Sequence, residues 1–153
     1  MTEGQNSAPR IVVGIDGSAR SKEALRWAAR IAAAENATID AVAAWHLPTY
    51  FGFAALPEGF SPKADIEKLL TEAVDEVFGP DRPAGMRLHV FEGDPARMLI
   101  EVSKGALMAV VGSRGHGGFS GLLLGSVSMK LAELATCPVL VVHGTARNAE
   151  AAS

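Results

Sequence analysis

The fold is decided by RIVVGIDGSARSKEALRWAARIAAAENATIDAVAAW, residues 10–45 of a chain of 153 residues. Residues 10–16 form a short β-branched run that ends in Gly and Asp, a pattern typical of a strand buried on both faces. A candidate N-cap, Ser18, is followed by apolar residues at helical spacing: Leu25, Ala28, Ala29 and Ala32. Residues 38–45 return to an apolar run led by β-branched residues. This order predicts a strand, a helix and a second strand.

The same alternation continues along the rest of the chain. Strand-like apolar runs occur at 86–93, 106–112 and 137–143, and helix-like stretches at 62–78, 95–104 and 126–136. Pro62 and Pro95 each follow a capping residue, a common way for a helix to begin. One side of the last helix carries Val127, Leu131 and Leu134. The pattern predicts an α/β fold, a single doubly wound five-stranded parallel sheet with helices on both faces (Rossmann-like).

Length and composition indicate one globular domain without a nucleic-acid surface. We expect the domain to span residues 10–144, between a flexible N-terminal segment, 1–9, and a flexible C-terminal tail, 145–153. Charged residues make up 20% of the chain, and the formal net charge is −3 with no run of Lys or Arg. Nucleic acid is therefore not an expected partner.

The sequence also favours a cytoplasmic location. Cys137 is the one cysteine, which suits a reducing compartment. The first ten residues lack the pattern of a signal peptide, and no apolar run is long enough to span a bilayer. We therefore expect no membrane partner. The histidines show no ligand-like spacing, so no metal site is expected at His46, His89, His116 or His143.

A long segment without periodicity, residues 46–62, lies between the second strand and the second helix. It contains three prolines, two glycines and four of the nine aromatic residues of the chain. Segments of this length inside compact domains are uncommon. Two interpretations stay open. The aromatic side chains pack on their own domain or on a second subunit, or the segment is a flap over a ligand.

The second distinctive stretch is VVGSRGHGGFSGLLLGS, residues 110–126, which has six glycines among its last fifteen positions. It follows the fourth strand and leads into a helix that begins near Gly125 and Ser126. The amides and positive dipole end of a helix N-terminus attract phosphate, and the hydroxyl groups of Ser126 and Ser128 add donors. If the first and fourth strands flank the point where strand order reverses, this loop shares one crevice with residues 14–18.

Common nucleotide and hydrolase motifs do not fit this stretch. There is no P-loop and no G-x-S-x-G, and a near match to G-x-G-x-x-G ends in Ser120 and follows the wrong strand. The pattern that fits is Gly112-x2-Gly115-x9-Gly125-Ser126. Together with IVVGIDGS at the first strand and PVLVV at the last, it resembles a universal stress protein of the ATP-binding kind. The resemblance runs from residue 10 to residue 143.

The resemblance implies ATP as the bound cofactor, with any Mg²⁺ carried by its phosphates and no metal ligand in the chain. The adenosine side would contact Gly14, Ile15 and Asp16, with the Asp16 carboxylate accepting from ribose hydroxyls, and the backbone of Ala44 would meet the adenine edge. The ribose and first phosphates would contact Val111, Gly112, Arg114 and Gly115. The outer phosphates would contact Gly125, Ser126, Val127 and Ser128.

The resemblance further implies a homodimer that pairs the last strand, Val139–Val142, with its copy. Such pairing would cover an exposed apolar edge. The main hypothesis is a nucleotide-responsive regulatory protein of the stress response. Two alternatives stay open: a dimeric interaction protein that uses no nucleotide, and a slow ATP hydrolase. A preference for cyclic AMP is a variant of the main hypothesis.

The question of enzyme activity stays open at this point. Phosphoryl transfer needs groups that orient the attacking atom and stabilise the developing charge, and no such set is evident beside the glycine stretch. We therefore assign no catalytic residue. Asp16 has a second interpretation, as a residue that caps the turn before the first helix.

Overall fold

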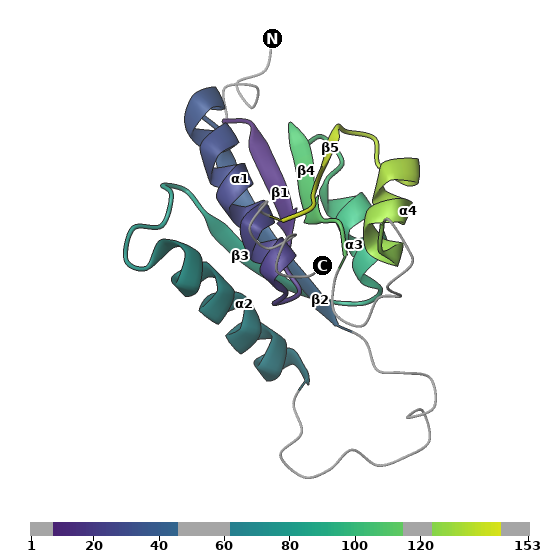
Figure 1. Ribbon diagram of the computed structural model, residues 1–153, viewed down its shortest axis with the longest axis horizontal. Helices are drawn as coiled ribbons and strands as arrows, with labels where there is room; N and C mark the ends of the chain where they lie inside the picture. The colour runs from purple at the N-terminus through teal and green to yellow at the C-terminus, as the bar shows by residue number, and fades with distance from the viewer. Residues whose placement is uncertain (1–7, 46–61, 115–123, 145–153) are drawn as a thin grey trace.

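A parallel sheet of five strands lies between two pairs of helices in the computed structural model of the chain (Figure 1). The structure describes residues 8–45, 62–114 and 124–144. Its strands are β1 (Arg10–Gly14), β2 (Thr38–Trp45), β3 (Arg87–Glu92), β4 (Met108–Gly112) and β5 (Val139–Val142). Its helices are α1 (Ala19–Glu35), α2 (Pro62–Phe78), α3 (Pro95–Val102) and α4 (Ser126–Leu134). The predicted fold class is confirmed.

The strand order is β3-β2-β1-β4-β5, and every neighbouring pair is parallel. The chain therefore builds the sheet outward from β1 in one direction, and then returns to place β4 on its other side. Strand order reverses between β1 and β4, which is where open α/β sheets bind ligands, beyond the carboxyl ends of the strands. The condition that the first and fourth strands flank this point is met.

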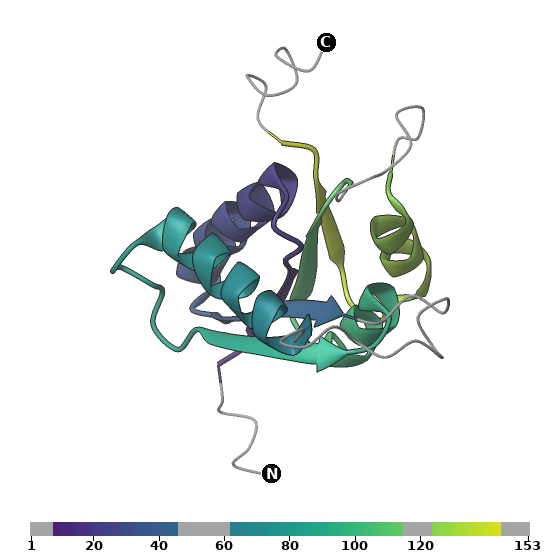
Figure 2. The same cartoon turned by 90° about the horizontal axis from the view of Figure 1, so that it is seen from below.

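Both faces of the sheet are covered by helices, as Figure 2 shows, with α1 and α2 on one face and α3 and α4 on the other. Ile11 and Val13 of β1 belong to the core beneath α1 and α2, and Val12 belongs to the core beneath α3 and α4. All three side chains are fully buried. This two-sided burial explains why β1 is a continuous apolar run rather than an alternating one.

The helix ends confirm most of the predicted caps. The Ser18 hydroxyl accepts a hydrogen bond from the Ser21 N–H at 3.2 Å, and the Asp94 carboxylate accepts one from the third residue of α3. Of the three residues placed on one side of α4, Leu131 is fully buried and Val127 packs against the core beneath α3 and α4, whereas Leu134, the last residue of the helix, is 59% exposed.

Several predictions fall on residues outside the described part of the chain, namely 1–7, 46–61, 115–123 and 145–153. The two interpretations of the aromatic segment and the expected flexible ends therefore stay predictions. Among the residues that the structure does describe, no helix is long and apolar enough to cross a membrane.

Candidate functional site

A cavity of about 530 Å³ opens at the carboxyl ends of β1, β2 and β4, where strand order reverses. Eleven of the twelve residues named from the sequence line it: Gly14, Ile15, Asp16, Ala44, Val111, Gly112, Arg114, Gly125, Ser126, Val127 and Ser128. The twelfth, Gly115, lies outside the described residues. The structure therefore brings four separate segments of the sequence, 14–16, 44, 111–114 and 125–128, together around one space.

The cavity also has walls that the sequence analysis did not name: Ser21, Val42, Ala43, Ile66, Leu69, Pro95, Leu99, Leu124 and Met129. Ile66 and Leu69 come from the first two turns of α2, and Pro95 and Leu99 come from α3. Helices that follow β2 and β3 must begin at the carboxyl ends of those strands. Apolar residues in their first turns were therefore a usable signal for the cavity wall.

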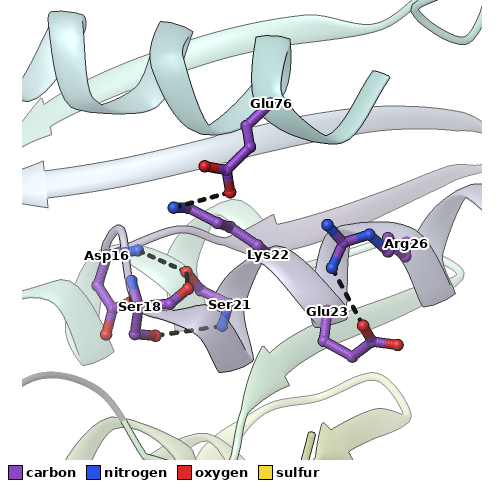
Figure 3. A network of polar contacts seen from close by, with 7 residues as sticks. All are labelled: Asp16, Ser18, Ser21, Lys22, Glu23, Arg26 and Glu76. Carbon is purple, nitrogen blue, oxygen red and sulfur yellow. Dashed lines mark hydrogen bonds and ion pairs between the residues drawn. The ribbon is translucent and has the colours of Figure 1, made fainter. Parts of the chain in front are cut away.

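The turn after β1 holds Asp16 through backbone and side-chain bonds (Figure 3). The Ser18 N–H donates to Oδ1 of Asp16 at 2.9 Å, and the Asp16 N–H donates to the Ser21 hydroxyl at 3.4 Å. Asp16 therefore does cap its turn, as the second interpretation required. That role uses one carboxylate oxygen, and the exposed side chain also lines the cavity, so the two interpretations are compatible.

The start of α4 is fixed to the end of β4 by a single carbonyl group. The Ser113 carbonyl accepts from the Gly125 N–H at 2.6 Å and from the Ser128 hydroxyl at 3.0 Å. The N-cap is Gly125, so no side chain caps this helix. By helix geometry the N–H groups of Ser126, Val127 and Ser128 lack intrahelical partners. The three residues line the cavity, as does Arg114, and such free amides at a helix N-terminus suit an anion.

Ser128 has a different role from the one expected of its hydroxyl. Its side chain is 2% exposed, and its hydroxyl lies 3.0 Å from the Ser113 carbonyl oxygen and 3.1 Å from that of Gly125. A hydroxyl has one proton to donate, and here it donates within the protein. The expectation that this hydroxyl is a further donor to a ligand is therefore not supported, whereas the Ser128 N–H keeps that capacity.

The backbone of Ala44 lies beyond the end of β1. Pairing of β2 with β1 ends at Val42, whose carbonyl accepts from the Ile15 N–H at 2.8 Å, whereas the Trp45 carbonyl accepts from Gly93 on the opposite side. Alternate residues of a parallel strand direct their backbone groups to the same neighbour. The N–H and C=O of Ala44 therefore face the cavity side, one donor beside one acceptor.

The profile of the universal stress protein family matches residues 8–143 of the chain. The chain belongs to this family. A universal stress protein from Mycolicibacterium smegmatis is 36% identical over 141 residues, which are 88% of this chain and 48% of the relative. The chain thus spans about half the length of that relative. Universal stress protein A homolog 1 from Coxiella burnetii is 35% identical over 136 residues, 86% of this chain and 94% of the relative.

Solved structures of universal stress proteins share the fold. One of them, described as a universal stress protein in complex with cAMP, is 32% identical, with a TM-score of 0.67. The match covers 91% of this chain and all of that one, 100%. The recognition made from IVVGIDGS, PVLVV and the glycine spacing is confirmed at the level of the family.

Two glycines of this universal stress protein have packing roles at the cavity. A Cβ at Gly14 would lie 2.8 Å from Cδ1 of Leu99 and 3.2 Å from Cγ1 of Val111. A Cβ at Gly112 would lie 2.8 Å from Cβ of Arg20 and 3.1 Å from the Ser21 nitrogen. Neither glycine has a positive φ. Both allow a helix to approach the sheet closely, a role that sequence spacing alone does not reveal.

The cavity has few charged groups. Asp16 and Arg114 are the charged side chains that line it, one from the turn after β1 and one from the residues after β4. Within the described ranges, no group of three or more His, Cys, Asp or Glu side chains is arranged to hold a metal ion. An anionic ligand here would rely on backbone amides together with Arg114.

Proposed function

We propose that this universal stress protein binds ATP in the cavity at the β1–β4 switch point. The observation that carries the proposal is the start of α4, where Ser126, Val127 and Ser128, whose N–H groups have no partner within the helix, line the same cavity as Asp16 and Ala44. A nucleotide has anionic, hydroxylated and aromatic parts in that order. The cavity offers amides, a carboxylate and a backbone donor–acceptor pair to match them.

The free energies available from the individual contacts favour a whole nucleotide over free phosphate as the ligand. One helix-dipole contact contributes about 0.3–2 kcal/mol, whereas micromolar affinity needs about −8 kcal/mol. The remaining free energy comes from the base and the ribose. Burying each 100 Å² of apolar surface contributes about 2.5 kcal/mol, and Ile66, Leu69 and Leu99 supply an apolar wall for the base.

Adenine and triphosphate are the finer parts of the proposal. The relative solved with cAMP supports an adenine nucleotide in this fold at 32% identity. We favour the triphosphate because three amides and Arg114 exceed the needs of a single cyclic phosphate. Any Mg²⁺ would then be held by the phosphates and water. The regulatory role, stress response in the cytoplasm through occupancy-dependent contacts, is part of the same proposal.

The first test identifies the native ligand. The protein is purified without added nucleotide and denatured, and the released small molecules are separated by chromatography and identified by mass. We expect ATP near one per chain, or an empty protein that binds ATP more tightly than ADP, AMP or cAMP in calorimetry. Tighter binding of cAMP would overturn the triphosphate part. A protein that is empty and ignores all four ligands would overturn the proposal and leave the interaction protein.

A second measurement separates binding from hydrolysis. Phosphate release from ATP is followed over hours with the wild-type protein and with Asp16→Ala. Release that is absent in the wild type fits a binding protein. Release at a measurable rate that is lost in Asp16→Ala would assign the release to this cavity and favour the slow hydrolase over a protein that only binds ATP.

A further inference from the structure

Ser21 is a buried serine in the first turn of α1, and its hydroxyl acts both as a hydrogen-bond donor and as an acceptor. Its hydroxyl donates to the Ser18 carbonyl at 3.0 Å and accepts from the Asp16 N–H at 3.4 Å (Figure 3). It is 3% exposed and lines the cavity. Ser21 thus connects the helix to the turn that carries Asp16.

The bonds around Ser21 close into a network that holds Asp16. The Ser21 N–H donates to the Ser18 hydroxyl at 3.2 Å, and the Ser18 N–H donates to Oδ1 of Asp16 at 2.9 Å. The backbone of Asp16 and one carboxylate oxygen are therefore both fixed from the helix. An exposed carboxylate without such bonds would lose rotamer freedom on binding a ligand. In this protein the network already restricts the rotamers of the Asp16 side chain before a ligand binds, so binding costs less conformational entropy.

The turn that carries Ser21 rests directly on Gly112. A Cβ at residue 112 would lie 2.8 Å from Cβ of Arg20, 3.0 Å from its carbonyl carbon and 3.1 Å from the Ser21 nitrogen. Two of these three atoms belong to the helix backbone, so they cannot move aside without shifting α1. The Arg20 side chain is also tied to the far edge of the sheet, since its Nε donates to the His143 carbonyl at 3.2 Å.

We propose that Ser21 is a positioning residue of the nucleotide site that acts through Asp16. Residue 112 must be glycine to seat the turn that carries Ser21, rather than to contact the nucleotide. The inference rests on the proposed function, because Asp16 is taken to accept from the ribose hydroxyls of ATP. The inference adds Ser21, which is not part of the pattern Gly112-x2-Gly115-x9-Gly125-Ser126. It also gives Gly112 a packing role in place of a contact with the nucleotide.

A double-mutant cycle tests whether Ser21 acts through Asp16. Calorimetry measures ATP binding to the wild type, Ser21→Ala, Asp16→Asn and the double variant. Asn at position 16 keeps an oxygen for the Ser18 N–H but loses the carboxylate. We expect Ser21→Ala to weaken ATP binding about three- to tenfold, the worth of one hydrogen bond. In the Asp16→Asn background the same change should have a much smaller effect, because the carboxylate that Ser21 is proposed to position is gone.

The ligand provides a second readout. Binding of 2′,3′-dideoxy-ATP, which lacks both ribose hydroxyls, should be the same in the wild type and in Ser21→Ala. Ser103→Ala is the matched control, since Ser103 is also buried and also donates to the carbonyl three residues earlier, at Ile100, but does not line the cavity. It should leave ATP binding unchanged while altering the melting temperature by an amount similar to that of Ser21→Ala.

The outcomes separate this inference from the proposed function. A wild-type protein that does not bind ATP overturns both. A wild type that binds ATP overturns the positioning role alone if Ser21→Ala has no effect, if its effect adds to that of Asp16→Asn, or if dideoxy-ATP binding weakens by the same factor. The last two results would make Ser21 a direct ligand contact or a purely structural residue.

Gly112→Ala tests the seating of the turn. We expect weaker ATP binding together with faster amide hydrogen exchange at residues 18–24, while exchange in α4 stays as in the wild type. Wild-type affinity and unchanged protection of the first turn of α1 would overturn this part. If Gly112→Ala does not fold, the Ser21 and Asp16 cycle still decides the positioning role.

Discussion

Ser128 donates its hydroxyl to the carbonyl oxygen of Ser113 over 3.0 Å, and this bond joins the third residue of α4 to the residue that follows β4. The same carbonyl accepts from the N–H of Gly125 at 2.6 Å. One buried peptide group therefore sets the position of the helix N-terminus. The amides proposed to hold phosphate are oriented by a residue that is itself not among those lining the cavity.

Replacing Ser128 with alanine should lower both stability and nucleotide affinity. Removing the hydroxyl leaves the Ser113 carbonyl with the Gly125 bond alone, and we expect a loss of about 1–2 kcal/mol in the free energy of unfolding. Urea denaturation measures the stability and calorimetry the binding of ATP. Ser126→Ala is the control, because Ser126 is exposed and should change stability by less than about 0.5 kcal/mol. Equal stability of the two variants would contradict the role assigned to Ser128.

Substitution of Asp40 should lower the stability of the protein without changing its affinity for ATP. The Asp40 side chain is 5% exposed and lies 3.0 Å from Nε of Arg87 and 3.6 Å from both Arg10 and His89. Asp40→Ala leaves the two arginines and His89 without the carboxylate, but all three side chains reach solvent, so we expect a loss of about 1–3 kcal/mol rather than the larger cost of a fully buried pair.

ATP binding should be unchanged in Asp40→Ala, because Asp40 lies four residues before Ala44 on β2 and does not line the cavity. Denaturation and calorimetry on the same preparation give both values. Asp40→Asn, which keeps the volume and one acceptor, should lie between the wild type and Asp40→Ala in stability. A large loss of ATP affinity in either variant would show that the carboxyl ends of the strands depend on this cluster.

The fold could be predicted because its determinants are local. Apolar runs such as residues 10–16 are long enough to indicate buried strands, and the βα order then restricts the topology. The cavity residues followed from the glycine spacing and the family resemblance. Contacts between residues that are distant in the sequence could not be predicted. Examples are the packing of α1 on Gly112, and that of Leu69 of α2 on Gly17, where an added Cβ would lie 3.1 Å from Cδ1 of Leu69.

The free edge of β5 leads to a prediction about assembly. Among the described strands, β5 pairs with β4 alone, and Val139, Leu140 and Val141 are only partly buried. The carbonyls of Pro138 and Val142 bond toward β4, so the backbone groups of Val141 face outward. We propose that this edge pairs with a second copy of the chain. Val141→Pro removes an outward N–H and should give a monomer, whereas Val141→Ala keeps the N–H and should stay dimeric.

Sedimentation velocity over a range of protein concentrations measures this difference, and circular dichroism verifies that both variants keep the fold. A wild-type protein that is monomeric at all concentrations would contradict the proposal. Two variants with equal dimer content would mean that a different surface forms the dimer.

A charge at residue 126 should move stability and binding in opposite directions. Ser126 is the first residue of α4, where a carboxylate interacts favourably with the helix dipole, by about 0.3–1 kcal/mol. Ser126→Asp should therefore keep or raise the melting temperature, and yet repel a triphosphate and weaken ATP binding by at least tenfold. Ser126→Asn is the neutral control of the same size, and adenosine, which carries no phosphate, should bind both variants equally. If Ser126→Asp keeps its melting temperature and yet binds ATP more weakly, unfolding cannot explain the lost binding. If Ser126→Asp binds ATP as the wild type does, the phosphates lie elsewhere and the amides at the start of α4 serve another purpose.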